Sequence, residues 1–155
     1  MKFLSFEICQ ETYGIQLSSV REVIAFNTFT KIPNMPNHFL GIMNLRDKVI
    51  PLMDARICLG LIPTLTSETS VIICAVKNTL IGIVVDCIFN VINPSDNEII
   101  SVGSQIEEVS GVISNVIKIE KGLVLILDID NFVKADPQTL QNISVQTSSL
   151  NLKAS

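Results

Sequence analysis

Short apolar runs rich in β-branched residues follow one another through the first 133 residues, and this succession constrains the fold more than any other feature. The chain holds 23 Ile and 15 Val but only 5 Ala. Such stiff side chains pack best on pleated sheets. Near the start, Leu4, Phe6 and Ile8 alternate with polar residues, which is the period of a half-buried strand. The sequence therefore predicts a mainly β protein with a few short helices.

Turn residues divide the apolar runs into expected elements. A second strand is expected from Tyr13 to Leu17, and the residues Pro33 to Pro36 predict a loop before a strand from Gly41 to Leu45. Arg46-Asp47-Lys48 is typical of a hairpin tip, and Val49 to Asp54 of the returning strand.

A capping box predicts one of the short helices. Ser19 and Glu22 have the spacing at which each side chain satisfies a free backbone donor at a helix start. In such a helix, Val20, Val23 and Ile24 would share the apolar face.

The second half of the chain repeats the order of the first. Three apolar segments recur at offsets of 68, 70 and 74 residues: Gly14–Leu17 at Gly82–Val85, Gly41–Asn44 at Gly111–Ser114, and Ile50–Asp54 at Val124–Asp128. Three matches in one order indicate a duplicated β subdomain. We expect two intertwined β-barrels, roughly 13–67 and roughly 68–133, with the terminal segments completing them in a single domain of residues 1–133.

The C-terminal part differs in composition. From Lys134 onward the chain is polar, with Asp136-Pro137 followed by a Ser-, Thr-, Gln- and Asn-rich stretch from Gln141 to Ser149. We expect a weak helix or a disordered tail over residues 134–155.

Charge and hydropathy exclude several classes of partner. The net charge of -4 and the pI near 4.9 give no attraction to phosphate backbones, so we expect no nucleic-acid partner. Met1 to Gln10 lacks the continuous apolar core of a secretion signal, and runs such as Val71 to Val76 are too short to span a bilayer. We expect a cytoplasmic protein without membrane insertion.

The sequence lacks the usual groups of an active site. His38 is the only histidine and lies in a loop, so no base accompanies a nucleophile, and there is no phosphate-binding glycine loop. The four cysteines have no CxxC spacing, which favours reduced core residues: Cys9, Cys58, Cys74 and Cys87. We expect no enzyme activity, metal site, cofactor or small-molecule substrate.

Three aspartates end apolar strands just before possible helical turns. Asp54, Asp86 and Asp128 each stand where a carboxylate accepts hydrogen bonds from free backbone N–H groups. We interpret all three as helix caps.

Several of these segments occur in an order that is characteristic of one family. They are Tyr13–Ile15, Val20–Ile24, Ile32–Pro36, Gly41–Arg46, Val49–Arg56, Val84–Asp86 and Leu125–Ile129. With them, and with residues 41–56 above all, the chain resembles the CheW-like domain family from about residue 3 to residue 133. The resemblance implies a pair of SH3-like five-stranded β-barrels, in agreement with the duplication.

The resemblance also implies an adaptor of chemotaxis signal transduction. Such a scaffold binds the signalling tips of chemoreceptors through a groove between the barrels, and the regulatory domain of the histidine kinase CheA through barrel ends, at membrane receptor arrays. Matching positions place six residues at the receptor groove: Val20, Glu22, Val23, Gly41, Asn44 and Arg46. An arginine at the rim of an apolar groove supplies oriented donors.

Each of these residues also has a structural interpretation. Val20 and Val23 suit core packing as well as a groove, Gly41 suits strand geometry, and Arg46 suits a solvated hairpin charge or a partner of Asp47. Asp47 replaces the glycine that the family usually has after this arginine, so the turn type and the preferred receptor can differ.

Two other functions fit the same residues less closely. One is an adaptor of a related kinase array that controls pilus motility, for which the same sequence motifs are expected. The other is a small-ligand-binding β-barrel protein, which requires a cavity with converging polar groups.

Overall fold

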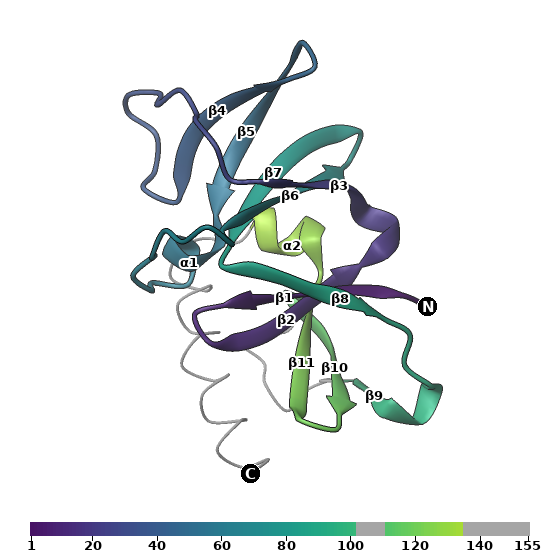
Figure 1. Cartoon of the computed structure of the whole chain (residues 1–155). Helices are drawn as coiled ribbons and strands as arrows, with labels where there is room; N and C mark the ends of the chain where they lie inside the picture. The colour runs from purple at the N-terminus through teal and green to yellow at the C-terminus, as the bar shows by residue number, and fades with distance from the viewer. Residues whose placement is uncertain (102–110, 135–155) are drawn as a thin grey trace.

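The computed structural model describes residues 1–101 and 111–134 (Figure 1). Strands dominate it, as predicted, and the helices are short: α1 (Ala55–Cys58), α2 (Ile129–Lys134) and the 3-10 turns Leu17–Ser19 and Asp96–Glu98. The expected tail of residues 134–155 lies outside the described residues, except for Lys134 at the end of α2.

The strands form two sheets. The six-stranded sheet has the order β8-β1-β2-β11-β10-β9 and the five-stranded sheet the order β3-β6-β7-β5-β4. The first contains β1 (Phe3–Ile8), β2 (Glu11–Gln16), β8 (Cys87–Ile92), β9 (Ile99–Ser101), β10 (Ile113–Ile119) and β11 (Gly122–Leu127). The second contains β3 (Val20–Ala25), β4 (Phe39–Leu45), β5 (Lys48–Asp54), β6 (Ser70–Val76) and β7 (Thr79–Val85).

Both sheets are built on the same plan. Each joins two antiparallel hairpins through one parallel pair, β2 with β11 in one sheet and β7 with β5 in the other. A further strand flanks the equivalent hairpin in each sheet, β8 beside β1 and β3 beside β6. The short strand β9 gives the first sheet its sixth member. The repeated segments of the sequence therefore occupy equivalent strands.

The chain exchanges hairpins between the two sheets. β1 and β2 pair with the late strands β8–β11, whereas β6 and β7 complete the sheet of β3–β5. The expected division at residues 67 and 68 consequently does not separate one sheet from the other. Each sheet is assembled from both halves of the sequence.

Three apolar cores hold this arrangement together. Ile50, Val71 and Val84 belong to a core of the five-stranded sheet, and Phe3, Ile117 and Val124 to a core of the six-stranded sheet. The largest core takes side chains from both sheets and from α2, which lies between them in Figure 1. Because β6 and β7 contribute to two cores, most of their residues are buried.

Three hairpins turn through two residues that both have positive φ. These turns are Cys9-Gln10, Arg46-Asp47 and Lys77-Asn78, between β1 and β2, β4 and β5, and β6 and β7. Positive φ at both positions is typical of the type I′ turn, whose twist matches that of the strands. The predicted hairpin tip at Arg46-Asp47 is thus confirmed.

The helix predicted from the capping box is wrong. Val20–Ala25 forms strand β3, which pairs with β6 so that Val23 faces Ile72 and Ile24 faces Val71. A strand is more stable than a helical turn here because its β-branched side chains fit a pleated sheet. Pairing with the buried strand β6 also satisfies more backbone hydrogen-bonding groups than a single capped turn would.

Candidate functional site

Arg46 and Glu22 form the polar centre of the expected receptor site. Arg46 lies in the β4–β5 turn, and its Nη1 and Nη2 donate to Oε2 and Oε1 of Glu22 on β3 at 2.6 and 3.2 Å. The Arg46 side chain is 74% exposed and that of Glu22 26%. The fork-to-fork geometry aligns the two groups, while water around Arg46 weakens their attraction.

An open pocket of about 550 Å³ lies beside this ion pair. Leu45, Ala75 and Leu80 provide apolar surface in it, and Arg21 and Lys48 add two further cations. An apolar pocket with a charged rim suits a protein surface that is both apolar and acidic.

The two valines lie on the opposite face of β3 from Glu22. Val20 pairs with Cys74 and packs against the large core between the sheets, and Val23 pairs with Ile72 on the same face. Val23 is nevertheless 40% exposed, because β3 is the edge of its sheet. Val20 is therefore a partly buried residue at the border of the large core, whereas Val23 is accessible to a partner.

Gly41 and Asn44 have different environments on β4. The φ of Gly41 is 153°, and a Cβ there would overlap the Thr30 carbonyl oxygen, so this glycine lets the chain after β3 bridge to β4. Asn44 is exposed and faces Val49 across the hairpin. The structural interpretation therefore fits Gly41, while Asn44 is free for contact.

The six predicted residues thus do not line one pocket. Arg46 and Glu22 meet at the pocket on one face, whereas Val20 and Val23 lie on the other face of the same edge strand. Glu22, Val20 and Val23 belong to the edge strand β3, and Arg46 reaches this strand from the β4–β5 turn.

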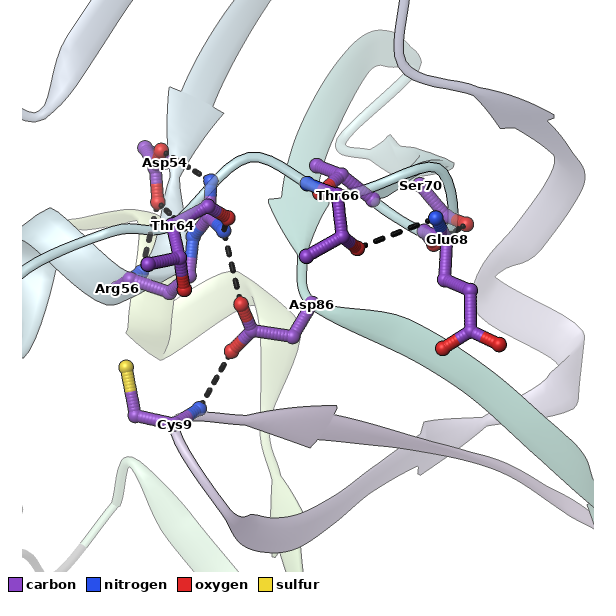
Figure 2. Close-up of polar contacts among 9 residues, drawn as sticks. Cys9, Asp54, Arg56, Thr64, Thr66, Glu68, Ser70 and Asp86 are labelled. Atoms are coloured by element: carbon purple, nitrogen blue, oxygen red, sulfur yellow. Dashed lines mark hydrogen bonds and ion pairs between the residues drawn. The ribbon is translucent and has the colours of Figure 1, made fainter.

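Sequence reasoning missed a buried ion cluster around Arg56 (Figure 2). Arg56 is 3% exposed, and its Nε and Nη2 donate to the two carboxylate oxygens of Asp54 at 3.0 Å each. Its Nη1 donates to Oδ1 of Asp86 at 2.8 Å and to the carbonyl of Thr64 at 2.7 Å. Oδ2 of Asp86 accepts from the backbone N–H of Cys9 at 2.6 Å.

This cluster joins the two sheets. Asp54 ends β5, Asp86 lies between β7 and β8 where the chain passes to the other sheet, and Cys9 lies in the β1–β2 turn. Burial lowers the pKa of Arg56, but hydrogen bonds and the charges of Asp54 and Asp86 outweigh it, so the pKa lies above its ordinary value. Arg56 is charged and fully engaged, which makes it a structural cation.

The three aspartates predicted as helix caps differ in role. Asp54 caps α1 by accepting from the backbone N–H of Arg56 at 2.9 Å, and Asp128 accepts from that of Asn131 in α2 at 3.2 Å. Asp86 is not a helix cap, since strand β8 follows it directly. Its carboxylate instead receives the bonds from Arg56 and Cys9.

The cysteines and the histidine do not form a common site among the described residues. Cys58 and Cys74 are buried as predicted, whereas Cys9 and Cys87 are only half-buried. Burial lowers the pKa of His38. Within residues 1–101 and 111–134, no three His, Cys, Asp or Glu side chains are placed to share a metal ion, and no helix is long and apolar enough to cross a membrane.

Two sheets with filled apolar cores, and an apolar pocket with a charged rim at one edge, are typical of a protein-binding β module. The family model for the CheW-like domain matches residues 2–136. The chain belongs to the CheW-like domain family.

Individual relatives agree with this assignment. A probable chemotaxis protein CheW of Rhizobium etli is 30% identical over 96 residues, 61% of this chain and 62% of the relative, so the match spans less than two thirds of that protein. The chemotaxis protein CheW of Bacillus subtilis is 30% identical over 129 residues, 82% and 83% of the two chains.

A solved structure has the same fold. The crystal structure of the scaffolding protein TtCheW from Thermoanaerobacter tengcongensis matches with a TM-score of 0.78 and 25% identity. The match covers 88% of this chain and 94% of that chain. It confirms the predicted pair of SH3-like barrels.

Proposed function

We propose that the chain is a non-catalytic adaptor of chemotaxis that couples chemoreceptors to the histidine kinase CheA. The proposal treats residues 1–133 as one functional domain, located in the cytoplasm and recruited to membrane receptor arrays. The observation that carries it is the exposed edge of the five-stranded sheet, where the Arg46–Glu22 pair and Val23 are accessible to a partner.

The receptor tip binds along this edge in our proposal. Arg46, Glu22 and Asn44 provide polar contacts, and Val23 provides apolar contact beside the rim residue Val20. A surface that combines an apolar patch with a forked cation recognises a helical hairpin by shape and by charge. Gly41 acts indirectly, by allowing the sheet to close.

The barrel interiors favour this function over ligand storage. Ile50, Leu52, Val71, Ile73 and Val84 are each at most 1% exposed and fill the interior of the five-stranded sheet. A small-ligand site needs space and converging polar groups. Among the described residues this core provides apolar side chains in close packing instead.

The test compares two binding partners in one experiment. The purified chain is titrated with a chemoreceptor cytoplasmic fragment and, separately, with the CheA regulatory domain, and both are expected to bind at micromolar concentrations. Arg46→Glu is expected to weaken receptor binding about tenfold or more while kinase binding and the melting temperature stay nearly unchanged.

Lys118→Glu serves as the matched charge reversal. Lys118 is exposed on β10 of the other sheet, far along the chain from β3 and β4. This variant should bind the receptor like the wild type. Failure of the wild-type chain to bind either partner overturns the proposal, and loss of both partners together with the melting transition in Arg46→Glu shows that Arg46 is structural.

A further inference from the structure

The segment between α1 and β6, residues 59–69, directs large apolar side chains into solvent. Ile62 is 88% exposed and Leu65 74%, whereas Leu59 at the start of the same segment is 2% exposed. Two large apolar side chains at such exposure within one short segment are a feature of contact surfaces.

This segment is anchored although its side chains are exposed. The buried guanidinium of Arg56 donates to the Thr64 carbonyl at 2.7 Å, and the Leu61 N–H donates to the Arg56 carbonyl at 2.9 Å. The Thr66 N–H donates to Oγ1 of Thr69 at 3.0 Å. Ile62 and Leu65 lie on either side of the Thr64 anchor, so a partner would meet a largely pre-organised surface.

Two open depressions flank these side chains. One, of about 670 Å³, is lined by Leu65 together with Phe26 and Phe29, whose ring centroids are 6.0 Å apart. The other, of about 640 Å³, is lined by Ile62 together with Glu7, Glu68 and Asp86. Thr66 lines both, which makes them neighbours.

The charge at this surface has one sign. Neither depression is lined by a lysine or arginine among the described residues. Glu7, Glu68 and Asp86 all line the second depression. Burial, together with their negative charges, raises the pKa of the nearby Cys87 thiol. Asp86 is bonded to Arg56, whereas no ion pair of the described residues involves Glu7 or Glu68.

We infer that this α1–β6 surface, formed by Phe29, Ile62, Leu65, Glu7 and Glu68, docks a protein segment with an apolar side chain next to a lysine or arginine. The apolar side chain would cover Leu65 and Phe29, and the cation would enter the acidic depression. The surface lies beyond the Asp54 end of β5, whereas the Arg46 turn lies at the Lys48 end, so the α1–β6 surface is separate from the Arg46 turn.

The probe is a pair of short synthetic amphipathic peptides with identical leucine positions. One carries arginine at its polar positions and the other glutamate. Each is titrated into the full chain while backbone amide signals are followed by nuclear magnetic resonance. The arginine peptide should bind about tenfold or more tightly than the glutamate peptide, lose affinity as salt is added, and shift the amides of residues 26–29 and 60–68.

Single substitutions with matched controls locate the contacts. Leu65→Ser and Glu68→Lys should each weaken the arginine peptide about tenfold. Val49→Ser likewise replaces an exposed apolar side chain, on the β4–β5 hairpin, and Glu120→Lys likewise reverses an exposed charge, at the β10–β11 turn; both should leave the affinity for the arginine peptide unchanged. Both substituted residues of the α1–β6 surface are exposed, so folding is retained.

Three results of the titrations overturn the inference: equal affinity of the two peptides, amide shifts confined to other residues, or wild-type affinity in Leu65→Ser. Sedimentation of the free chain is measured in parallel. A concentration-dependent dimer that Leu65→Ser abolishes would assign the surface to a second copy and also overturn it. Because neither receptor nor kinase is present, the outcome is independent of the proposed adaptor function.

Discussion

The guanidinium of Arg46 meets the carboxylate of Glu22 across 24 positions of sequence, with Nη1 2.6 Å from Oε2. The contact joins the tip of the β4–β5 hairpin to the edge strand β3, which stand at opposite ends of the strand order of their sheet. Closure of the sheet brings both ends together. The pair therefore reports on closure as well as on the proposed receptor contact.

The Arg46–Glu22 pair should contribute little to folding. A double-mutant cycle of Arg46→Ala and Glu22→Ala is expected to give a coupling of about 0.2–1 kcal/mol in urea denaturation, because Arg46 is largely in water. Added salt should reduce it further. A coupling free energy well above this range would mean that the pair mainly stabilises the fold, instead of remaining accessible to a binding partner.

Asp47 should be replaceable by glycine with a gain in stability. Its φ is 65°, which glycine adopts freely and aspartate only at some cost. Asp47→Gly is expected to raise the free energy of unfolding by about 0.5–1 kcal/mol. Asp47→Ala, which lacks this freedom, is the control and should not stabilise the protein; equal effects of the two changes would contradict a type I′ turn.

Gly41 should be required for sheet closure. Gly41→Ala is expected to lower the melting temperature strongly, since its Cβ would overlap the Thr30 carbonyl. Gly122→Ala is a matched control: its φ is 141°, but no atom lies within 4 Å of an added Cβ. It shares the backbone strain without the overlap and should destabilise less. Normal stability with lost receptor binding in Gly41→Ala would instead favour direct contact.

Removal of the Arg56 side chain should be severe. Arg56→Ala leaves the carboxylates of Asp54 and Asp86 without their cation, and breaking a buried pair in this way costs about 3–5 kcal/mol. Arg21→Ala, at an exposed position, should cost far less. Chemical denaturation measures both, and similar losses would show that the Arg56 cluster is accessible to water.

The buried thiols predict how stability falls at alkaline pH. Burial is the main reason that the pKa values of Cys58 and Cys74 rise from the ordinary 9.0 to about 12. The folded state therefore retains thiol protons that the unfolded state releases above pH 9, so stability is full below pH 9 and declines between pH 9 and 12. The double variant Cys58→Ala and Cys74→Ala should show a shallower decline in denaturation followed across this range.

Local chemistry explains the parts of the fold that could be predicted. Asp54 and Asp128 cap helices as expected because a cap involves only the next few residues. The Arg46-Asp47 turn was recognisable from polar residues between two apolar runs. Even the duplication could be read from the sequence, since equivalent strands need equivalent patterns of apolar residues.

Contacts between distant segments explain the parts that could not. Ser19 and Glu22 have the signature of a helix start, yet Val20 pairs with Cys74 in a strand that sequence does not place beside it. The partner of Arg46 is Glu22 and not its neighbour Asp47. The Arg56 cluster draws on Asp86 and on backbone groups of Thr64 and Cys9, whose positions depend on the complete fold.

The exchange of hairpins makes the domain indivisible. A backbone cut in the loop between Cys58 and Ser70 would leave the β1–β2 hairpin in one fragment and its flanking strands β8 and β11 in the other. The β6–β7 hairpin would likewise be separated from its flanking strands β3 and β5. Neither piece can shield its own apolar faces, so each would need its counterpart to become soluble. Each repeat therefore depends on the other to fold, and insertions are tolerated best in the loops that join the strands.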